Sequence, residues 1–300
     1  MRKDYAVFNK LQGDIVKQRI EEYIISSVKR FVEIGIKPKL AVIRAGDDAG
    51  QKYYENAILK QSKAYGIETQ SIKLSSEVRQ AVLDVTLEAL CQDETIHGII
   101  MLRPFPSHID GEKLRNMLKP TKDVDAITDI SIAELFVGKS DAFFACTAEA
   151  CMEVMHYYGF SPEGKNVTIV GRSLTVGKPL SMMMLNENAT ITVCHSKTPK
   201  DEQIKACKNA DIVVLATGMT QYYESEFFRN GQIVLDVGTG KGKDGKMHGD
   251  LNIEQIEEDG KITEMTYTPV PGGIGQVTTA ILLRNIIKAA EKTKKNFCNL

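Results

Sequence analysis

The residues best suited to chemistry lie in a glycine-containing turn that starts at Gly171. This glycine follows the run 166–170, which is β-branched from Val167 on, and Gly177 opens a segment that is mostly apolar from 180 to 185. A strand, a tight turn and a helix in this order leave N–H groups at the helix N-terminus, where the helix dipole favours a phosphate. The pattern therefore predicts a pyrophosphate site. Ser173 stands where the GxGxxG fingerprint has its middle glycine, so an ordinary strand-to-helix turn without a ligand stays the alternative.

The end of the next expected strand, 189–193, indicates which dinucleotide would fit. Residues 194–198 read Cys-His-Ser-Lys-Thr and contain no acid. An NAD-binding unit usually carries Asp or Glu there, which accepts hydrogen bonds from the ribose hydroxyls. Hydroxyls and a cation, with Arg172 in the preceding turn, suit a phosphate on that ribose and favour NADP over NAD. A solvated loop is the alternative interpretation of Ser196 and Lys197.

Length, charge and cysteine usage exclude several classes of protein. The 300 residues suit two domains, and a net charge of −1 with mixed signs argues against nucleic acid or an anionic membrane as the main partner. No apolar run approaches the roughly 20 residues of a membrane span, and the N-terminus has no apolar signal region. The 6 cysteines and 5 histidines show no ligand-like spacing. We therefore expect reduced thiols, no metal site and a cytoplasmic location.

The elements that must position these residues alternate between strand and helix. The pattern predicts strands at 39–44, 67–74, 97–102, 166–170, 189–193, 211–216 and 232–236, with helices at 12–33, 52–65, 77–91, 111–118, from about 146, and at 277–294. Such alternation predicts an α/β protein with mostly parallel sheets. Residues 240–250 are rich in glycine and lysine and predict an exposed loop, and 268–275 predicts a rigid non-helical stretch.

With these elements in order, the chain resembles the methylenetetrahydrofolate dehydrogenase/cyclohydrolase family almost from end to end. The motifs that carry the resemblance are Val170 to Ser173 with Val176 to Pro179, then 194–198, Lys122 to Asp125, and Thr268 to Gly275. The resemblance implies an α/β catalytic domain at 1–145, completed by a C-terminal helix at 276–300, and a Rossmann-like cofactor domain with a parallel sheet at 146–275. It also implies a cytoplasmic homodimer. The implied reaction is oxidation of methylenetetrahydrofolate to the methenyl form with NADP, followed in many members by hydrolysis to formyltetrahydrofolate.

The resemblance also implies roles for individual residues. Asp125 matches the aspartate that accepts hydrogen bonds from the amino-pyrimidine edge of the pterin, where a carboxylate can take two parallel N–H donors. Tyr54 matches the tyrosine that stacks on the folate. Without the motif, these two residues would be interpreted as a loop-capping acid and a half-buried helix tyrosine. The implied folate contacts further include Leu102, Pro271, Gly272 and Gly273. The implied cofactor contacts are Gly171, Arg172, Ser173, Val176, Gly177, Pro179, His195, Ser196, Thr217, Gly218, Gly238, Thr239 and Thr279.

Two positions depart from the family pattern, and both affect the same catalytic pair. The family lysine that comes four residues after the tyrosine is replaced by Ile58. The glutamine that orients this lysine, in a strand that ends Gln-Leu-Pro, is replaced by Leu102, and Arg103 follows it. Lys60 is the nearest lysine and is the candidate catalytic substitute. Six residues correspond to about 240° around a helix, however, which puts Lys60 near the face opposite Tyr54.

The two half-reactions of the family need different groups. Oxidation moves a hydride to the nicotinamide and mainly requires that the two rings are held face to face. Hydrolysis of the methenyl cation needs a positioned acid–base group to activate water. The sequence therefore predicts a dehydrogenase with cyclohydrolase activity in doubt. One alternative is the full bifunctional enzyme, with Lys60, Glu55 or Arg103 in the role of the lysine. A second is a non-catalytic folate or nucleotide sensor, against which the retained Asp125 argues.

Overall fold

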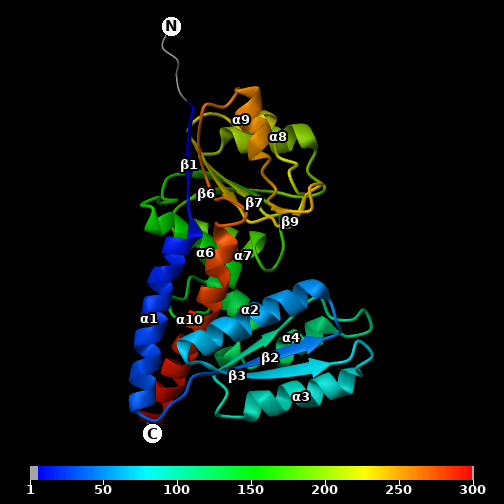
Figure 1. The fold of residues 1–300 in the computed structure, drawn as a ribbon, viewed down its shortest axis with the longest axis vertical. Helices are drawn as coiled ribbons and strands as arrows, with labels where there is room; N and C mark the ends of the chain where they lie inside the picture. The colour runs from blue at the N-terminus through cyan, green and yellow to red at the C-terminus, as the bar shows by residue number, and fades with distance from the viewer. Residues whose placement is uncertain (1–5, 299–300) are drawn as a thin grey trace. The chain divides into compact units, whose positions relative to one another are not determined.

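The computed structural model describes residues 6–298 and contains two compact α/β units. The first unit consists of residues 6–17 and 145–278, and the second of residues 18–144 and 279–298. We call them the six-strand unit and the three-strand unit, after the number of strands in the main sheet of each. All strand pairs in both sheets are parallel, so the predicted α/β class with parallel sheets is confirmed (Figure 1).

The six-strand unit has a sheet in the order β1-β11-β8-β7-β5-β6. Its strands are β1 (Val7–Lys10), β5 (Asn166–Val170), β6 (Thr190–Cys194), β7 (Ile212–Leu215), β8 (Gln232–Asp236) and β11 (Glu264–Tyr267). Its helices are α6 (Cys146–Tyr157), α7 (Gly177–Asn186), α8 (Lys200–Asn209), η2 (Ser225–Phe227) and α9 (Ile253–Asp259). Strand β7 is buried along its whole length, as expected for a central parallel strand covered on both faces.

Two features of this unit differ from the sequence-based expectation. Strand β1 pairs with β11, so the first described residues belong to the six-strand unit, whereas the sequence analysis assigned 1–145 to the catalytic domain. The segment 240–250 contains the hairpin β9 (Gly240–Lys241) and β10 (Met247–His248) and ends in the fully buried Asp250. The prediction of an exposed loop is therefore wrong at its end, because local composition does not show that this residue is packed under other loops.

The three-strand unit has the sheet order β3-β2-β4, with β2 at Lys39–Ala45, β3 at Glu68–Leu74 and β4 at Gly98–Met101. Its other elements are α2 (Ala49–Tyr65), α3 (Gln80–Gln92), α4 (Gly111–Met117), η1 (Pro120–Lys122) and α5 (Asp129–Phe136). Ala41, Ile43 and Ala45 of β2 pack with α3 and α4 in one core. Arg44 points to the opposite face because side chains alternate along a strand. Figure 1 shows α2 and α3 on opposite faces of this sheet.

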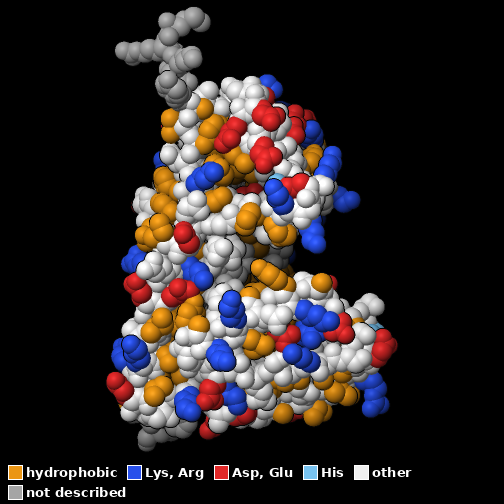
Figure 2. Space-filling view, in the orientation of Figure 1, with side chains coloured by type: hydrophobic (Ala, Val, Ile, Leu, Met, Phe, Trp, Pro, Cys, Tyr) orange, Lys and Arg blue, Asp and Glu red, His pale blue; other side chains and the backbone are white. Residues whose placement is uncertain are grey.

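Two long helices, α1 (Gly13–Glu33) and α10 (Ile274–Cys298), each contribute residues to both units. Within the part of the chain that the structure describes, no helix is long and apolar enough to cross a membrane. Basic and acidic side chains are interspersed on the face seen in Figure 2, in keeping with the net charge of −1.

Candidate active site

The turn between β5 and α7 is built so closely that only glycine fits at two positions. Gly171 has φ of 129°, and a Cβ placed on it would lie 2.4 Å from the carbonyl oxygen of Ala216. A Cβ on Gly177 would lie 2.0 Å from the carbonyl oxygen of Gly171. Helix α7 then begins at Gly177 with no side-chain cap, while the Ser173 hydroxyl accepts from the N–H of Val176 at 3.1 Å. At the start of α7 the N–H of Lys178 donates to the Ser173 carbonyl at 3.0 Å and Pro179 carries no N–H, so the N–H of Gly177 is the group of this first turn that a phosphate could use. The pyrophosphate site stays a prediction.

The predicted ribose-phosphate residues follow the ends of two neighbouring strands. Val170 of β5 pairs with Cys194 of β6, so Arg172 and Ser196 each lie two residues beyond a paired position. The side chains of Arg172, Ser196 and Lys197 are exposed. Two cations and one hydroxyl are therefore exposed just beyond the ends of adjacent strands, an arrangement that suits a phosphate.

The turn after β6 is held by its own hydrogen bonds. The N–H of His195 donates to the Thr198 hydroxyl at 3.0 Å, and the N–H of Lys197 lies 3.2 Å from Nδ1 of the His195 ring. The N–H of Thr198 donates to the His195 carbonyl at 2.8 Å. These bonds set the direction of the exposed residues in between.

Two buried aspartates tie the loops that follow β7 and β8 together, and sequence reasoning missed both. Oδ2 of Asp250 accepts from the N–H of Thr217 at 2.7 Å, its hydroxyl at 2.8 Å, and the N–H of Gly218 at 3.1 Å. Oδ1 of Asp236 accepts from the N–H of Gly238 at 2.9 Å and of Asp250 at 3.1 Å. Thr217, Gly218 and Gly238 are predicted cofactor residues, so the two carboxylates position candidate cofactor loops.

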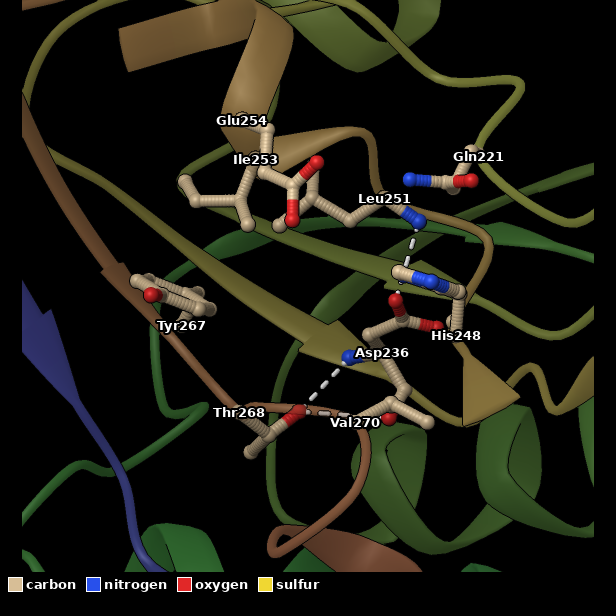
Figure 3. Close-up of a pocket in the computed structure, with 10 residues that line it drawn as sticks. Gln221, Asp236, His248, Leu251, Ile253, Glu254, Tyr267, Thr268 and Val270 are labelled. Carbon is tan, nitrogen blue, oxygen red and sulfur yellow. Dashed lines mark hydrogen bonds between the residues drawn. The ribbon is translucent and has the colours of Figure 1, made fainter. Parts of the chain in front are cut away.

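Asp236 also lines a small cavity of about 40 Å³ (Figure 3). Its Oδ2 accepts from the N–H of Leu251 at 2.9 Å, and its N–H donates to the Thr268 hydroxyl at 2.7 Å. Burial raises the pKa of Asp236 to about 7, against the effect of its backbone hydrogen bonds, and the charge of Asp250 adds to the rise. The sequence offered one signal for this residue, an acid directly after the apolar run Ile233 to Leu235.

The stretch 268–275 is packed against the start of α1 within the six-strand unit. The N–H of Gly13 donates to the carbonyl of Gly272 at 2.7 Å, and a Cβ on Gly13 would lie 2.1 Å from the Gly273 carbonyl oxygen. Gly272 has φ of 113°, which a side chain would strain, and the Val270-Pro271 bond is cis. The predicted folate contacts Pro271, Gly272 and Gly273 thus lie on a closely defined loop.

Four further predicted cofactor residues lie at the starts of helices or in a loop. Val176 and Pro179 flank the first residues of α7, and Thr239 is exposed after Gly238. Thr279 is buried in the second turn of α10, one residue beyond the part of that helix that belongs to the six-strand unit.

In the three-strand unit, helix α2 presents one buried face made of Gln51, Glu55, Ile58 and Ser62. Ile58 is 0% exposed, whereas Lys60 is exposed and Tyr54 is half-buried. Leu102, which follows β4, is 3% exposed. The structure thus puts in the core the two apolar side chains that were predicted to stand in place of the family's lysine and glutamine, and it puts Lys60 on the solvent side of the helix.

Beneath α2 lies a buried ion pair that sequence reasoning also missed. Nε of Arg44 donates to Oε2 of Glu55 at 2.6 Å, and the two side chains are only 7% and 3% exposed. The Ser71 hydroxyl donates to the other carboxylate oxygen, and the Lys73 ammonium lies 3.8 Å from it. Burial raises the pKa of Glu55, but the hydrogen bonds from Ser71 and Arg44 outweigh it and hold the pKa below its ordinary value. Glu55 is therefore an ionised structural group here.

Asp125 lies on a loop that is held from both sides. The buried carboxylate of Asp123 accepts from the N–H of Thr128 at 2.8 Å and from the Ser131 hydroxyl at 2.7 Å. The Asn285 side chain donates to the carbonyl of Val124 at 3.0 Å. These bonds fasten the residues that flank Asp125 and so determine where its carboxylate can lie.

An ion pair joins Asp125 to the residue that follows Leu102. Nη2 of Arg103 lies 3.2 Å from Oδ2 of Asp125, and the side chains are 35% and 21% exposed. The structure thus brings Asp125 together with Arg103, a residue that the sequence analysis had considered only as a lysine substitute.

The parallel six-strand sheet, with its glycine turn leading into an uncapped helix, defines a two-unit α/β protein of the Rossmann-like nucleotide-binding class. The model of the tetrahydrofolate dehydrogenase/cyclohydrolase catalytic domain matches residues 11–125, and the NAD(P)-binding domain of the same family matches residues 145–294. The chain belongs to the tetrahydrofolate dehydrogenase/cyclohydrolase family, which confirms the resemblance that the motifs indicated.

Similar proteins extend over nearly the whole chain. It is 38% identical over 285 residues to the bifunctional protein FolD of Clostridium kluyveri, covering 95% of this chain and 98% of that one. Among solved structures, the bifunctional enzyme FolD of Campylobacter jejuni is 31% identical, with a TM-score of 0.90 over 95% of this chain and 99% of that one. The FolD structure from Trypanosoma brucei, complexed with NADP and inhibitor, is 29% identical, with a TM-score of 0.89 over 97% of this chain and 99% of that one.

Proposed function

We propose that the protein is an NADP-dependent methylenetetrahydrofolate dehydrogenase with weak cyclohydrolase activity. The observation that carries the proposal is the contrast between an intact cofactor turn and an altered catalytic pair. Gly171 and Gly177 allow the close backbone approaches that shape the turn between β5 and α7, while Ile58 and Leu102 are 0% and 3% exposed.

For the cofactor, the residues fit a phosphorylated dinucleotide. The N-terminus of α7 would take the pyrophosphate, and Arg172 with Ser196 would take the phosphate on the ribose. Thr217, Gly218, Gly238 and Thr239 would line the nicotinamide half, on the loops that Asp236 and Asp250 hold. NADP, when bound, supplies the hydride acceptor.

For the folate, Asp125 would accept two N–H donors from the pterin edge, and Tyr54 would stack on the ring. Hydride transfer from the one-carbon bridge removes no proton from that carbon, and the adjacent nitrogen lone pair stabilises the cation. The folate-binding residues therefore need only to orient the bridge, which can contribute several kcal/mol to lowering the barrier. Apolar walls at Ile58 and Leu102 are compatible with this step.

Hydrolysis of the methenyl product has poorer support. Water activation needs a group that can exchange a proton at the one-carbon centre. Glu55 is held in the buried pair with Arg44, Lys60 is exposed on another side of α2, and Arg103 is paired with Asp125. A substitute for the lysine must lie at the one-carbon centre and must be able to exchange a proton there. None of these three candidates meets both requirements.

The test is an assay that follows NADPH and methenyltetrahydrofolate absorbance together, with purified protein, methylenetetrahydrofolate and NADP. We expect NADPH to form while the methenyl product accumulates. Hydrolysis as fast as oxidation would support the bifunctional alternative, and Lys60→Met would then show whether Lys60 acts. Folate binding without NADPH formation would support the sensor alternative instead.

The cytoplasmic homodimer stays part of the proposal, and sedimentation analysis tests the dimer.

A further inference from the structure

The ion pair between Arg103 and Asp125 places a cationic donor beside an anionic acceptor on a partly exposed surface. One N–H of the guanidinium faces Oδ2 of Asp125 at 3.2 Å, and a guanidinium carries five N–H donors in all. Further donors therefore remain on the same group, and 35% of the Arg103 side chain is exposed. A ligand that reaches Asp125 meets these donors next to the carboxylate.

Both members of the pair are held by their neighbours. Arg103 follows Leu102, whose N–H donates to the carbonyl of Ile43 at 2.9 Å. On its other side, the Gln51 amide donates to the carbonyl of Pro104 at 2.7 Å. Asp125 is held by the bonds of Asp123 and Val124 described above. The donor and the acceptor therefore start from defined backbone positions, which lowers the entropic cost of using them together.

We propose that Arg103 is a specificity-determining residue that, together with Asp125, selects pteridines with an oxo group at ring position 4. Asp125 accepts from the ring N–H and the 2-amino group, and Arg103 donates to the 4-oxo oxygen that lies beside the ring N–H. This inference rests on the proposed function, since it takes the pterin edge as the ligand of Asp125.

The selectivity follows from hydrogen-bond complementarity. A 4-amino pteridine presents N–H donors where the 4-oxo form presents an acceptor, so it would face the guanidinium donors with donors of its own. A guanidinium N–H that loses its water to the ligand and finds no acceptor there costs binding free energy, and this cost exceeds what the ring gains by fitting the same space. Sites built around such hydrogen bonds discriminate strongly between analogues that differ in one polar group.

The experiment measures equilibrium binding of tetrahydrofolate and of its 4-amino-4-deoxy counterpart to the whole protein by calorimetry. We expect the wild-type protein to prefer the 4-oxo form, and Arg103→Leu to reduce this preference roughly tenfold or more, the scale of a charge-assisted hydrogen bond. Arg103→Lys should retain part of the preference because it keeps a cationic donor. The matched control is Arg115→Leu, which breaks another Arg–Asp pair of the same unit, to Asp129 at 2.8 Å, and should leave the preference unchanged.

Each outcome decides a different question. An unchanged ratio in Arg103→Leu overturns the inference while folate binding stands. Tighter binding of the 4-oxo form to that variant also overturns it, because Arg103 would then compete with the ligand for Asp125. Asp125→Ala should weaken both ligands, and failure of both to bind even the wild-type protein would overturn the folate assignment itself. Far-UV circular dichroism and urea denaturation of every variant serve as the test of folding.

Discussion

The two units share one way of holding a candidate ligand loop and differ in a second. In both, a buried carboxylate accepts from backbone N–H groups, as Asp250 does from Thr217 and as Asp123 does from Thr128 beside Asp125. Around its candidate site the three-strand unit adds pairs of charged side chains, Arg44 with Glu55 and Arg103 with Asp125. The first arrangement depends on the course of the main chain, and the second on the identity of two residues at a time.

This difference indicates which positions tolerate a substitution. A glycine at 171 or 177 has no substitute, since any Cβ would lie within 2.4 Å of a carbonyl oxygen. A side-chain pair can be replaced as a pair if its volume is kept. In the three-strand unit, Ile58 and Leu102, which we predict to stand in place of the family's catalytic lysine and glutamine, are apolar core residues, while a buried charged pair lies under the same helix.

The largest effect should come from breaking that buried pair. Glu55→Ala removes the buried partner of Arg44 and leaves the guanidinium with its Nη1 contacts to the exposed Asp47 and to the Gly46 carbonyl, so we expect the free energy of unfolding to fall by about 3 kcal/mol in urea denaturation, the lower end of the range for a broken buried pair. Replacing both residues with apolar ones, as in Arg44→Met with Glu55→Leu, should recover much of this loss. The control is Glu68→Ala, which removes an exposed pair with Lys37 and should cost at most about 1 kcal/mol. Equal losses for Glu55→Ala and the control would show that the buried pair adds no stability.

The same contrast determines what the sequence could predict. The strand 166–170, the turn and α7 are consecutive in the chain, and their glycine requirement is local, so the pattern alone located them. Asp250 lies after a stretch rich in glycine and lysine, and only its tertiary packing buries it. Likewise, β1 was missed because its partner, β11, begins more than 250 residues later in the chain. The pairing of Arg44 with Glu55 depends on which face of β2 meets α2, and no spacing rule gives that face.

In the six-strand unit, Arg172→Ala should weaken NADP binding by about 1.5–3 kcal/mol, the scale of a charge-assisted hydrogen bond to a phosphate. NAD lacks that phosphate, so its affinity should change little. Comparison of KM and binding constants for the two cofactors provides the measurement, and NAD serves as the internal control. Equal losses for both cofactors would exclude a role for Arg172 at the ribose phosphate.

Asp236 should make the stability of the six-strand unit depend on pH. Burial raises its pKa to about 7 in the folded state, so the folded protein binds more protons than the unfolded chain between about pH 4 and pH 7. The contribution of Asp236 to the free energy of unfolding is therefore largest below the pKa that its carboxyl has in the unfolded chain. It falls as the pH rises to about 7, by at most about 1.4 kcal/mol per pH unit. Asp236→Asn should flatten this slope in denaturation experiments, whatever its effect on absolute stability. Asp201→Asn, an exposed acid on α8, should leave the slope unchanged, and an unaltered slope in Asp236→Asn would show that another group titrates.

The smallest expected effect, and the one that tests the apolar catalytic pair, is a gain of hydrolysis. Ile58→Lys with Leu102→Gln should raise formyltetrahydrofolate formation up to about tenfold, which is less than the roughly hundredfold or more that a well-positioned acid–base group contributes, because the introduced pair replaces two packed core side chains. Ile58→Lys alone should gain less, because the position is 0% exposed and a buried lysine without a partner tends to lose its proton. Leu102→Gln alone is the matched control, since it adds the orienting amide without the group that exchanges protons. A stopped assay that separates the methenyl and formyl products measures the result. If the double variant hydrolyses no faster than the wild-type protein while oxidation is retained, the loss of the lysine and glutamine is not what limits hydrolysis in this chain.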